Sequence, residues 1–312
     1  MPTEQTVIIL NPAANAGRAS ALRPWLAAAL RELGARLVVT SAAGEAEQVA
    51  AAAAADGWPR VVAVGGDGTV QEAINGIMAG PSARRPVLGV LAAGSGNDLA
   101  RSLRLPRARH EALAVAVNGD PIAIDVAEAA DASGRRRHFA SAGGTGFDAQ
   151  VAHAMARPRG RWQRGRVGYL LSTLAELRRY RNARLSLRWE DGTAGSVEAE
   201  LRALMVAFAN GAYYGGGMRI APEARLDDGL LDLCIVGDIT RREAVRQLPG
   251  LYRGAHVTHP AVRMARAGRL EIDGEPSAVH LDGEPFGQLP LRVTVRPRAL
   301  GVATVPSAAT RR

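Results

Sequence analysis

The sequence contains no lysine, so all 39 of its basic residues are arginine. This absence excludes a P-loop of the GxxxxGK type, the strand lysine of protein kinases and any Schiff-base lysine. The single cysteine, Cys234, excludes an internal disulfide and a zinc site built from several cysteines. No apolar run is long enough to cross a membrane, and the start MPTEQTVIILNP lacks the basic region of a signal peptide. We therefore expect a cytoplasmic protein.

The chain also has fewer acidic than basic residues, 30 against 39, which gives a net charge of +9. Such a charge favours an acidic partner, either nucleic acid or anionic lipid. Aromatic residues form only 4% of the chain and are not interleaved with the arginines, so base-stacking surfaces are missing. We expect no nucleic-acid partner. At 312 residues the chain has room for two domains of ordinary size.

The first part of the chain alternates strand-like and helix-like segments. Apolar runs such as TVIIL (6–10), RVVAV (60–64) and PVLGVL (86–91) are each followed by a helical pattern, and one such helix is predicted from Val70 to Met78. This alternation predicts a parallel sheet with helices on both faces. After about Asp125, short strands and hairpin turns predict a mostly antiparallel β domain with one inserted helix, near 167–181.

Three glycine-rich loops fall at the ends of predicted strands, namely NPAANAG (11–17), GGDGT (65–69) and GSGND (94–98). Glycines let the backbone approach a ligand and take positive φ, and a following helix offers free N–H groups, so GGDGT predicts a phosphate site. A carboxylate beside phosphates needs a divalent cation or an attacking hydroxyl between them, which makes Asp67 a candidate for phosphoryl transfer. A glycine-rich turn with a helix cap would have the same sequence.

These loops and three later motifs occur in the order of the diacylglycerol kinase catalytic family, and the chain resembles its soluble bacterial lipid kinases, which are similar to sphingosine kinases. The later motifs are GGTGFDAQV (143–151), NGAYYGGGMRIAPEARLDDGLLDL (210–233) and LDGEP (281–285). The resemblance implies a NAD-kinase-like α/β domain over 1–126 that binds ATP, and the C-terminal segment 291–312 is expected to return to this domain. It also implies a β-sandwich domain over 127–290 that binds the lipid, with the active site in the cleft between the two.

The resemblance also implies roles for single residues. A nucleotide site is implied at Asn11, Thr40, Gly65, Gly66, Asp67, Gly68, Thr69, Val70, Gln71, Ser95 and Asn97. Ser95 replaces a common threonine and keeps the hydroxyl, whereas Ala14 and Asn15 replace a common serine or lysine and weaken the phosphate role of the first loop. Among the arginines, Arg18 and Arg101 are candidate phosphate contacts.

Two further motifs carry implied metal and catalytic residues. In ARLDDGLLD the carbonyls of Arg225 and Leu230 and the carboxylate of Asp228 would hold Mg²⁺, which prefers such oxygen ligands. In LDGEP, Glu284 would be the general base, with Asp282 and Asp67 as neighbours that share the work with a catalytic magnesium. Plain turns would explain both motifs as well, and IDGEP (272–276) repeats almost the same string.

The sequence therefore predicts an ATP- and Mg²⁺-dependent lipid kinase bound peripherally to the inner face of the membrane. An NAD kinase and a non-catalytic nucleotide- or lipid-binding regulator remain as alternatives, and a homodimer is left open. Docking on an anionic membrane is expected for the segment 157–188, which is rich in arginine and carries a leucine stripe. Packing of that stripe against the sandwich is the alternative. His256 and His259 are expected at the surface.

Overall fold

The computed structural model describes residues 6–156, 173–190 and 195–305. Residues 157–172 of the segment 157–188 expected to dock thus lie outside the described residues, whereas residues 173–177 are helical. The chain divides into two compact units, Met1–Asp125 with Arg298–Arg312 and Val126–Pro297, here called unit 1 and unit 2. No helix in the described ranges has the length and apolar character that a membrane span requires.

Unit 1 is built on parallel strands in the order β2-β1-β3-β4, with the end of β16 pairing in parallel at Val302 and Leu88. Its strands are β1 (Thr6–Leu10), β2 (Arg36–Val39), β3 (Arg60–Gly65) and β4 (Val87–Ala92). Its α-helices are α1 (Leu22–Leu33), α2 (Glu45–Ala55), α3 (Asp67–Ala79), α4 (Asp98–Ser102) and α5 (Arg109–Asn118). The predicted alternation of strands and helices is therefore confirmed.

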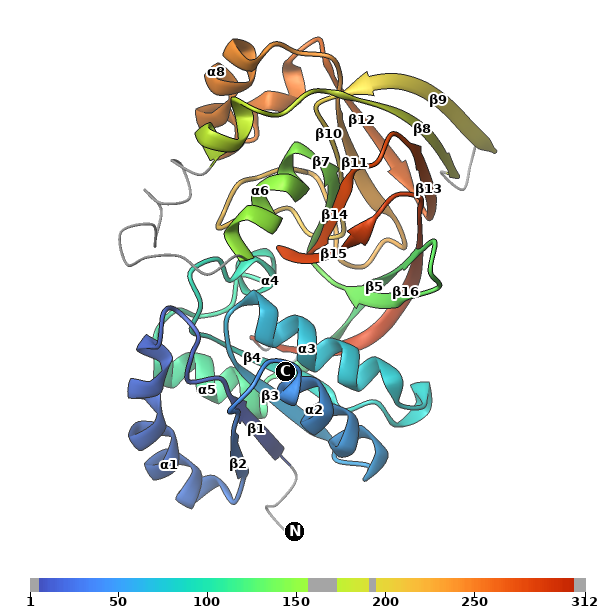
Figure 1. Cartoon of the computed structure of the whole chain (residues 1–312). Coiled ribbons are helices and arrows are strands. Elements are labelled where there is room, and N and C mark those ends of the chain that lie inside the picture. Colours follow the sequence, from blue (N-terminus) through green and yellow to red (C-terminus); the bar gives the residue numbers. More distant parts are fainter. Residues whose placement is uncertain (1–5, 157–172, 191–194, 306–312) are drawn as a thin grey trace, which may run out of the picture. The chain divides into compact units, whose positions relative to one another are not determined.

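The strands of unit 1 are buried on both faces. Ile8 and Leu10 of β1 pack in one cluster with residues of α1 and α5, while the alternate residues Val7 and Ile9 are buried as well. Helices α2 and α3 pack against each other and against β1 and β3 (Figure 1). Because both faces are covered, ligands have access at the strand ends, where the glycine-rich loops lie.

Unit 2 is a β-sandwich with helices beside it. One sheet has the order β12-β11-β10-β7-β14-β15, and the other contains β16-β13-β8-β9 with β5 and β6. The strands are β5 (Asp120–Asp131), β6 (Arg136–Phe139), β7 (Ala142–Gly146), β8 (Ala183–Glu190), β9 (Ser196–Ala203), β10 (Met205–Ala209), β11 (Leu231–Val236), β12 (Val262–Ala267), β13 (Arg269–Gly274), β14 (Ala278–Leu281), β15 (Glu284–Gln288) and β16 (Leu291–Thr304). The helices are α6 (Phe147–Ala156) and α8 (Arg241–Leu251).

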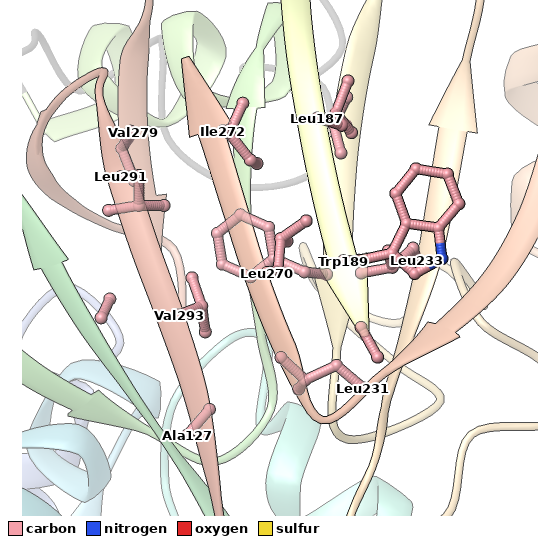
Figure 2. Packing of buried hydrophobic residues seen from close by; sticks show 14 of the residues in the cluster. Ala127, Leu187, Trp189, Leu231, Leu233, Leu270, Ile272, Val279, Leu291 and Val293 are labelled. Atoms are coloured by element: carbon pink, nitrogen blue, oxygen red, sulfur yellow. The ribbon is translucent and has the colours of Figure 1, made fainter. Parts of the chain in front are cut away.

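The two sheets of unit 2 enclose an apolar core, shown in Figure 2. Strand β8 alternates strictly between buried and exposed residues, and its buried Leu187 and Trp189 contribute to the same cluster as Leu233 of the facing sheet. This alternation is the pattern of strands with one face in a core and one face in water. The predicted fold class, an α/β domain with a mostly antiparallel β-sandwich, is confirmed.

Candidate functional site

Two glycines of GGDGT, Gly65 and Gly66, lie in close contact with neighbouring residues. A Cβ added to Gly66 would lie 3.2 Å from the Cα of Gly94, and one added to Gly65 would overlap the side chain of Thr69. None of Gly65, Gly66 and Gly68 has positive φ. The expectation of positive φ in this loop is therefore wrong, and the absence of side chains instead lets the β3–α3 and β4–α4 loops touch.

Asp67 ties these two loops together. Its Oδ2 accepts a hydrogen bond from the backbone N–H of Asn97 at 2.8 Å, and its Oδ1 accepts one from the N–H of Asp98 at 2.7 Å. A Cβ on Gly96 would collide with the same carboxylate. Burial raises the pKa of Asp67 despite these two bonds. Helix α3 begins at Asp67 rather than at Val70, because the loop residues already form its first turn.

Hydrogen bonds also involve three more of the predicted nucleotide residues, namely Asn11, Thr69 and Asn97. Asn11 Nδ2 donates to Thr69 Oγ1 at 3.0 Å, so the first loop is linked to GGDGT. Asn97 has a φ of 56°, and its side-chain amide both accepts from the N–H of Gly94 and donates to its carbonyl. The structure thus brings Asn11, Asp67, Thr69 and Asn97 into one network at the carboxyl edge of the strands.

The other predicted nucleotide residues are placed around this network. Thr40 is buried at the end of β2, and its N–H donates to the carbonyl of Leu10 at 2.9 Å. The side chains of Val70 and Gln71 are buried within helix α3, whereas Ser95 is exposed.

A pocket of about 540 Å³ opens beside the GSGND loop in unit 1. Its polar lining consists of Asn15, Arg18, Asn97, Arg101, Arg107 and Arg109. Four arginines without an acidic side chain in the lining favour an anion. Two of them, Arg18 and Arg101, were expected as phosphate contacts. The other two were missed, although both belong to the basic stretch PRARH (106–110).

LDGEP forms the two-residue turn between β14 and β15. Asp282 and Gly283 have φ values of 49° and 84°, as a turn of type I′ needs. The Asp282 carboxylate accepts hydrogen bonds from three consecutive backbone N–H groups, those of Ala140, Ser141 and Ala142, at 3.2, 2.9 and 3.0 Å. Asp282 therefore fixes the hairpin to the start of β7, and the side chain of Glu284 is exposed next to this anchored turn.

The second copy, IDGEP, does not form such a turn, because Ile272–Gly274 are the end of strand β13 and Glu275 lies in the connection to β14. Asp273 accepts only from the N–H of the next residue, Gly274, and Glu275 Oε2 accepts from the N–H of Arg184 at 3.2 Å. The two nearly identical sequences thus differ in the backbone N–H groups that bond to their aspartates.

Asp228 lies in the loop before β11 and has an oxygen that no hydrogen bond satisfies. Its Oδ1 accepts from the N–H of Leu230 at 3.1 Å, whereas its buried Oδ2 has no hydrogen-bond partner, and the same holds for Oδ2 of Asp232. One arginine, Arg266, approaches both carboxylates, at 4.0 Å and 3.6 Å. Burial raises the pKa of Asp232, and the charge of Asp228 adds to this effect.

Two carboxylates beside a single arginine leave a net negative charge, which suits a bound cation. Within the described ranges no group of three or more His, Cys, Asp or Glu side chains is placed to hold a metal ion, so carbonyl oxygens would have to complete such a site. Oxygen ligands of this kind are those of Mg²⁺ and Ca²⁺. Asp232 was missed because it looks like an ordinary inward-facing residue of a strand.

The Asp228 loop and the LDGEP hairpin lie at different strands of the six-stranded sheet. Strands β10 and β7 separate β11, which follows the Asp228 loop, from β14, which leads into the hairpin.

An apolar pocket lies between the second face of the six-stranded sheet and its helices. It is lined chiefly by Phe147, Val151, Leu177, Leu204, Met205, Tyr214, Met218, Val236, Ile239, Leu248, Leu251 and Val262. Its free volume of about 70 Å³ is below the roughly 300 to 1,000 Å³ of typical ligand pockets, so a chain-like ligand would have to widen it.

Asp148 is the acidic side chain in this lining, and it bonds to a histidine. Its Oδ2 lies 3.2 Å from Nε2 of His280, and the two side chains are only 6% and 3% exposed. His280 belongs to β14, four residues before Glu284. Sequence reasoning missed this pair, because its members are 132 residues apart.

The expectation that His256 and His259 lie at the surface is wrong for His256. This residue is 2% exposed, lines the apolar pocket and donates from Nε2 to the carbonyl of Ile220 at 3.0 Å. Burial lowers the pKa of its ring. His259 is half-buried and lines the same pocket.

Comparison with known proteins assigns the chain to a family. Residues 5–129 match the diacylglycerol kinase catalytic domain, and residues 141–304 match the YegS C-terminal NAD kinase beta sandwich-like domain. The chain is 34% identical over 297 residues to a protein of Mycobacterium tuberculosis named "Diacylglycerol kinase", covering 94% of this chain and 93% of the relative. It is also 34% identical over 277 residues to "Probable lipid kinase YegS-like" of Chromohalobacter salexigens, covering 88% and 86%.

A solved structure agrees with these matches at the level of the fold. The crystal structure of a diacylglycerol kinase from Bacillus anthracis str. Sterne superposes with a TM-score of 0.71 over 98% of both chains, at 22% sequence identity. The chain belongs to the diacylglycerol kinase catalytic family, as its motifs predicted, and is a lipid kinase.

Proposed function

We propose that this lipid kinase uses ATP and Mg²⁺ to phosphorylate a hydroxyl of diacylglycerol or a related lipid at the inner face of the membrane. The observation that carries the lipid assignment is the link between the apolar pocket and the LDGEP hairpin. Asp148 lines the pocket and bonds to His280 on the strand that leads to Glu284. An apolar chain in the pocket would therefore place its polar end near this hairpin.

The nucleotide is assigned to the loop network of unit 1. Backbone N–H groups at the start of α3 and the arginines of the neighbouring pocket are suited to the phosphates of ATP. Asp67 has both carboxylate oxygens bonded to backbone N–H groups, so its part in this proposal is to hold the two glycine-rich loops in place.

Magnesium is assigned to the loop before β11. Asp228 and Asp232 each direct an oxygen without a hydrogen-bond partner into this buried site, and the carbonyls of Arg225 and Leu230 would complete the ligands. The ion would supply positive charge that Arg266 alone does not provide.

Glu284 is assigned as the general base. It would accept the proton of the lipid hydroxyl as the hydroxyl oxygen bonds to the γ-phosphorus and the bond to the β–γ bridging oxygen breaks, releasing ADP. Asp282 is bonded to three backbone N–H groups and would position the turn rather than take the proton.

A direct test is to incubate the protein with labelled ATP, Mg²⁺ and lipids dispersed in detergent micelles, with NAD in a parallel reaction. We expect label in a diacylglycerol or a related lipid and none in NAD. Label in NAD alone would support an NAD kinase, and the absence of any labelled product would support a non-catalytic regulator.

A further inference from the structure

An open groove of about 440 Å³ in unit 2 is lined by residues of α8 and of the segment 174–178. Figure 1 shows the helical residues 173–177 beside α8. We call this groove the arginine-rimmed groove. It is lined by Leu174, Leu177, Arg178, Arg241, Arg242, Val245 and Arg246. Among the described residues, three apolar side chains thus meet four arginines, and none of the lining residues is acidic.

The rim arginines outnumber the acidic residue next to them on α8. That residue, Glu243, is engaged in a capping box with Thr240, whose N–H donates to its Oε2 at 2.8 Å. The Thr240 hydroxyl and, to a smaller extent, the charge of Arg246 lower the pKa of Glu243, so its charge offsets part of the rim. Arg241 donates to the carbonyl of Tyr180 at 3.1 Å and is still exposed. The groove therefore keeps a net positive rim.

The groove also has an apolar floor that is open to solvent. Val245 is 41% exposed, which is unusual for a large apolar side chain in this protein. A soluble polyanion such as nucleic acid would gain nothing from an exposed valine or leucine. A basic rim around apolar side chains instead matches the interface of an anionic bilayer, where phosphates lie above acyl chains.

The arginine-rimmed groove and the apolar pocket share a wall. Leu177 lines both, and α8 faces the groove with Val245 and the pocket with Ala244 and Leu248. Residues of α8 and Leu177 thus line both the groove and the pocket. A lipid that leaves the bilayer at the groove would thus reach the pocket by a short displacement of this wall.

We propose that the arginine-rimmed groove docks on anionic membranes and forms the entrance through which a lipid reaches the apolar pocket. This inference rests on the proposed lipid kinase function for its second half, whereas the docking itself can be measured without catalysis. The groove includes Leu174, Leu177 and Arg178 of the segment 157–188 expected to dock, and it adds residues of α8.

The test compares binding of the full chain to vesicles of phosphatidylglycerol and phosphatidylcholine with binding to phosphatidylcholine alone. The variant replaces Arg178, Arg241, Arg242 and Arg246 by Gln. A matched control replaces the exposed Arg23, Arg36, Arg84 and Arg253, which changes the net charge equally. Each basic residue at such a surface contributes about fivefold in affinity, so we expect at least a tenfold loss for the groove variant and less than a twofold change for the control. Equal losses in the two variants would overturn the docking.

A second variant, Val245→Asp, tests the apolar floor. Because Val245 is exposed, the substitution leaves the fold intact, and we expect vesicle binding to weaken further than loss of one positive charge would explain. Unchanged vesicle binding would show that the groove holds a soluble polyanion and that the inference is wrong.

Activity measurements separate this inference from the proposed function. We expect the groove variant to phosphorylate lipid in detergent micelles at the wild-type rate and to lose activity only on vesicles. Equal activity of wild type and variant on vesicles would exclude the groove as the lipid entrance. If the wild type phosphorylates no lipid in micelles, the proposed function fails, while the vesicle-binding result still decides the docking.

Discussion

The carboxylate of Asp67 accepts hydrogen bonds from the backbone N–H groups of both Asn97 and Asp98, about 30 residues away along the chain. These bonds fix the relative position of the two glycine-rich loops before any ligand is bound. Asp67 thus stabilises the fold of unit 1. Its substitution should lower the stability of the protein without ligand, whereas substitution of a residue that only contacts a ligand should not.

The first prediction concerns Asp67→Asn. The amide nitrogen cannot accept a hydrogen bond, so one backbone N–H of the β4–α4 loop would lose its partner, at a cost of about 1–3 kcal/mol in the free energy of unfolding. Urea unfolding without ATP or magnesium measures this cost. Wild-type stability of the variant, together with a loss of ATP binding, would instead place Asp67 among the ligand contacts alone.

The second prediction compares two glycines. A Cβ on Gly96 would collide with the Asp67 carboxylate, whereas a Cβ on Gly66 would meet the Cα of Gly94 at 3.2 Å, a contact that a small shift relieves. Gly96→Ala should therefore lower the unfolding free energy by about 1–3 kcal/mol, and Gly66→Ala by less. Thermal denaturation of both variants without nucleotide checks this order. Wild-type stability of both variants would show that the glycines serve only the approach of a nucleotide.

The third prediction concerns magnesium at Asp228. An ion that binds only the folded state adds about 2.7 kcal/mol of stability at 100 times its dissociation constant. We expect this gain in melting experiments with the wild type and its loss in Asp228→Ala. Asp227→Ala is the matched control, because its carboxylate is directed to Arg225 at the surface. Identical magnesium-dependent shifts in all three proteins would show that the loop is only a turn.

The fourth prediction concerns pH and His256. Burial lowers the pKa of this ring below the ordinary 6.5, so its contribution to stability is complete above pH 6.5 and is lost as the pH falls from 6.5 towards the lowered pKa. His256→Gln retains a donor for the Ile220 carbonyl but cannot take up a proton. Unfolding free energies at pH 7.5 and 5.5 should therefore differ less in this variant than in the wild type. The same substitution at the exposed His110 serves as a control, and an equal pH dependence of wild type and His256→Gln would contradict the assignment.

Patterns along the chain predicted much of the fold, because they depend on nearby residues. The alternation of buried runs such as TVIIL with helical segments predicted the parallel strands of unit 1, and hairpin signals predicted the sandwich. The bonds of Asp67 and the pair Asp148–His280 were not predictable in this way, because each joins residues far apart in the sequence. His256 was misplaced because Pro260 argued only against a local helix, not against burial under a distant strand.

The catalytic role of Glu284 is the central claim, and the chain supplies its own control. LDGEP and IDGEP carry a glutamate at the same position of nearly the same sequence, but only LDGEP forms a hairpin turn, in which Asp282 is anchored by three backbone N–H groups. Replacing Glu284 by glutamine removes the basic carboxylate and should lower turnover by a factor of about 10² to 10⁴. Glutamine keeps the shape, so ATP binding should persist.

The most direct measurement is the turnover of Glu284→Gln and Glu275→Gln on micellar diacylglycerol, with ATP binding measured in parallel. We predict that Glu284→Gln loses turnover by that factor and still binds ATP, while Glu275→Gln turns over like the wild type. Near-normal turnover of Glu284→Gln, or an equal loss in both variants, would contradict the assignment of Glu284 as the base.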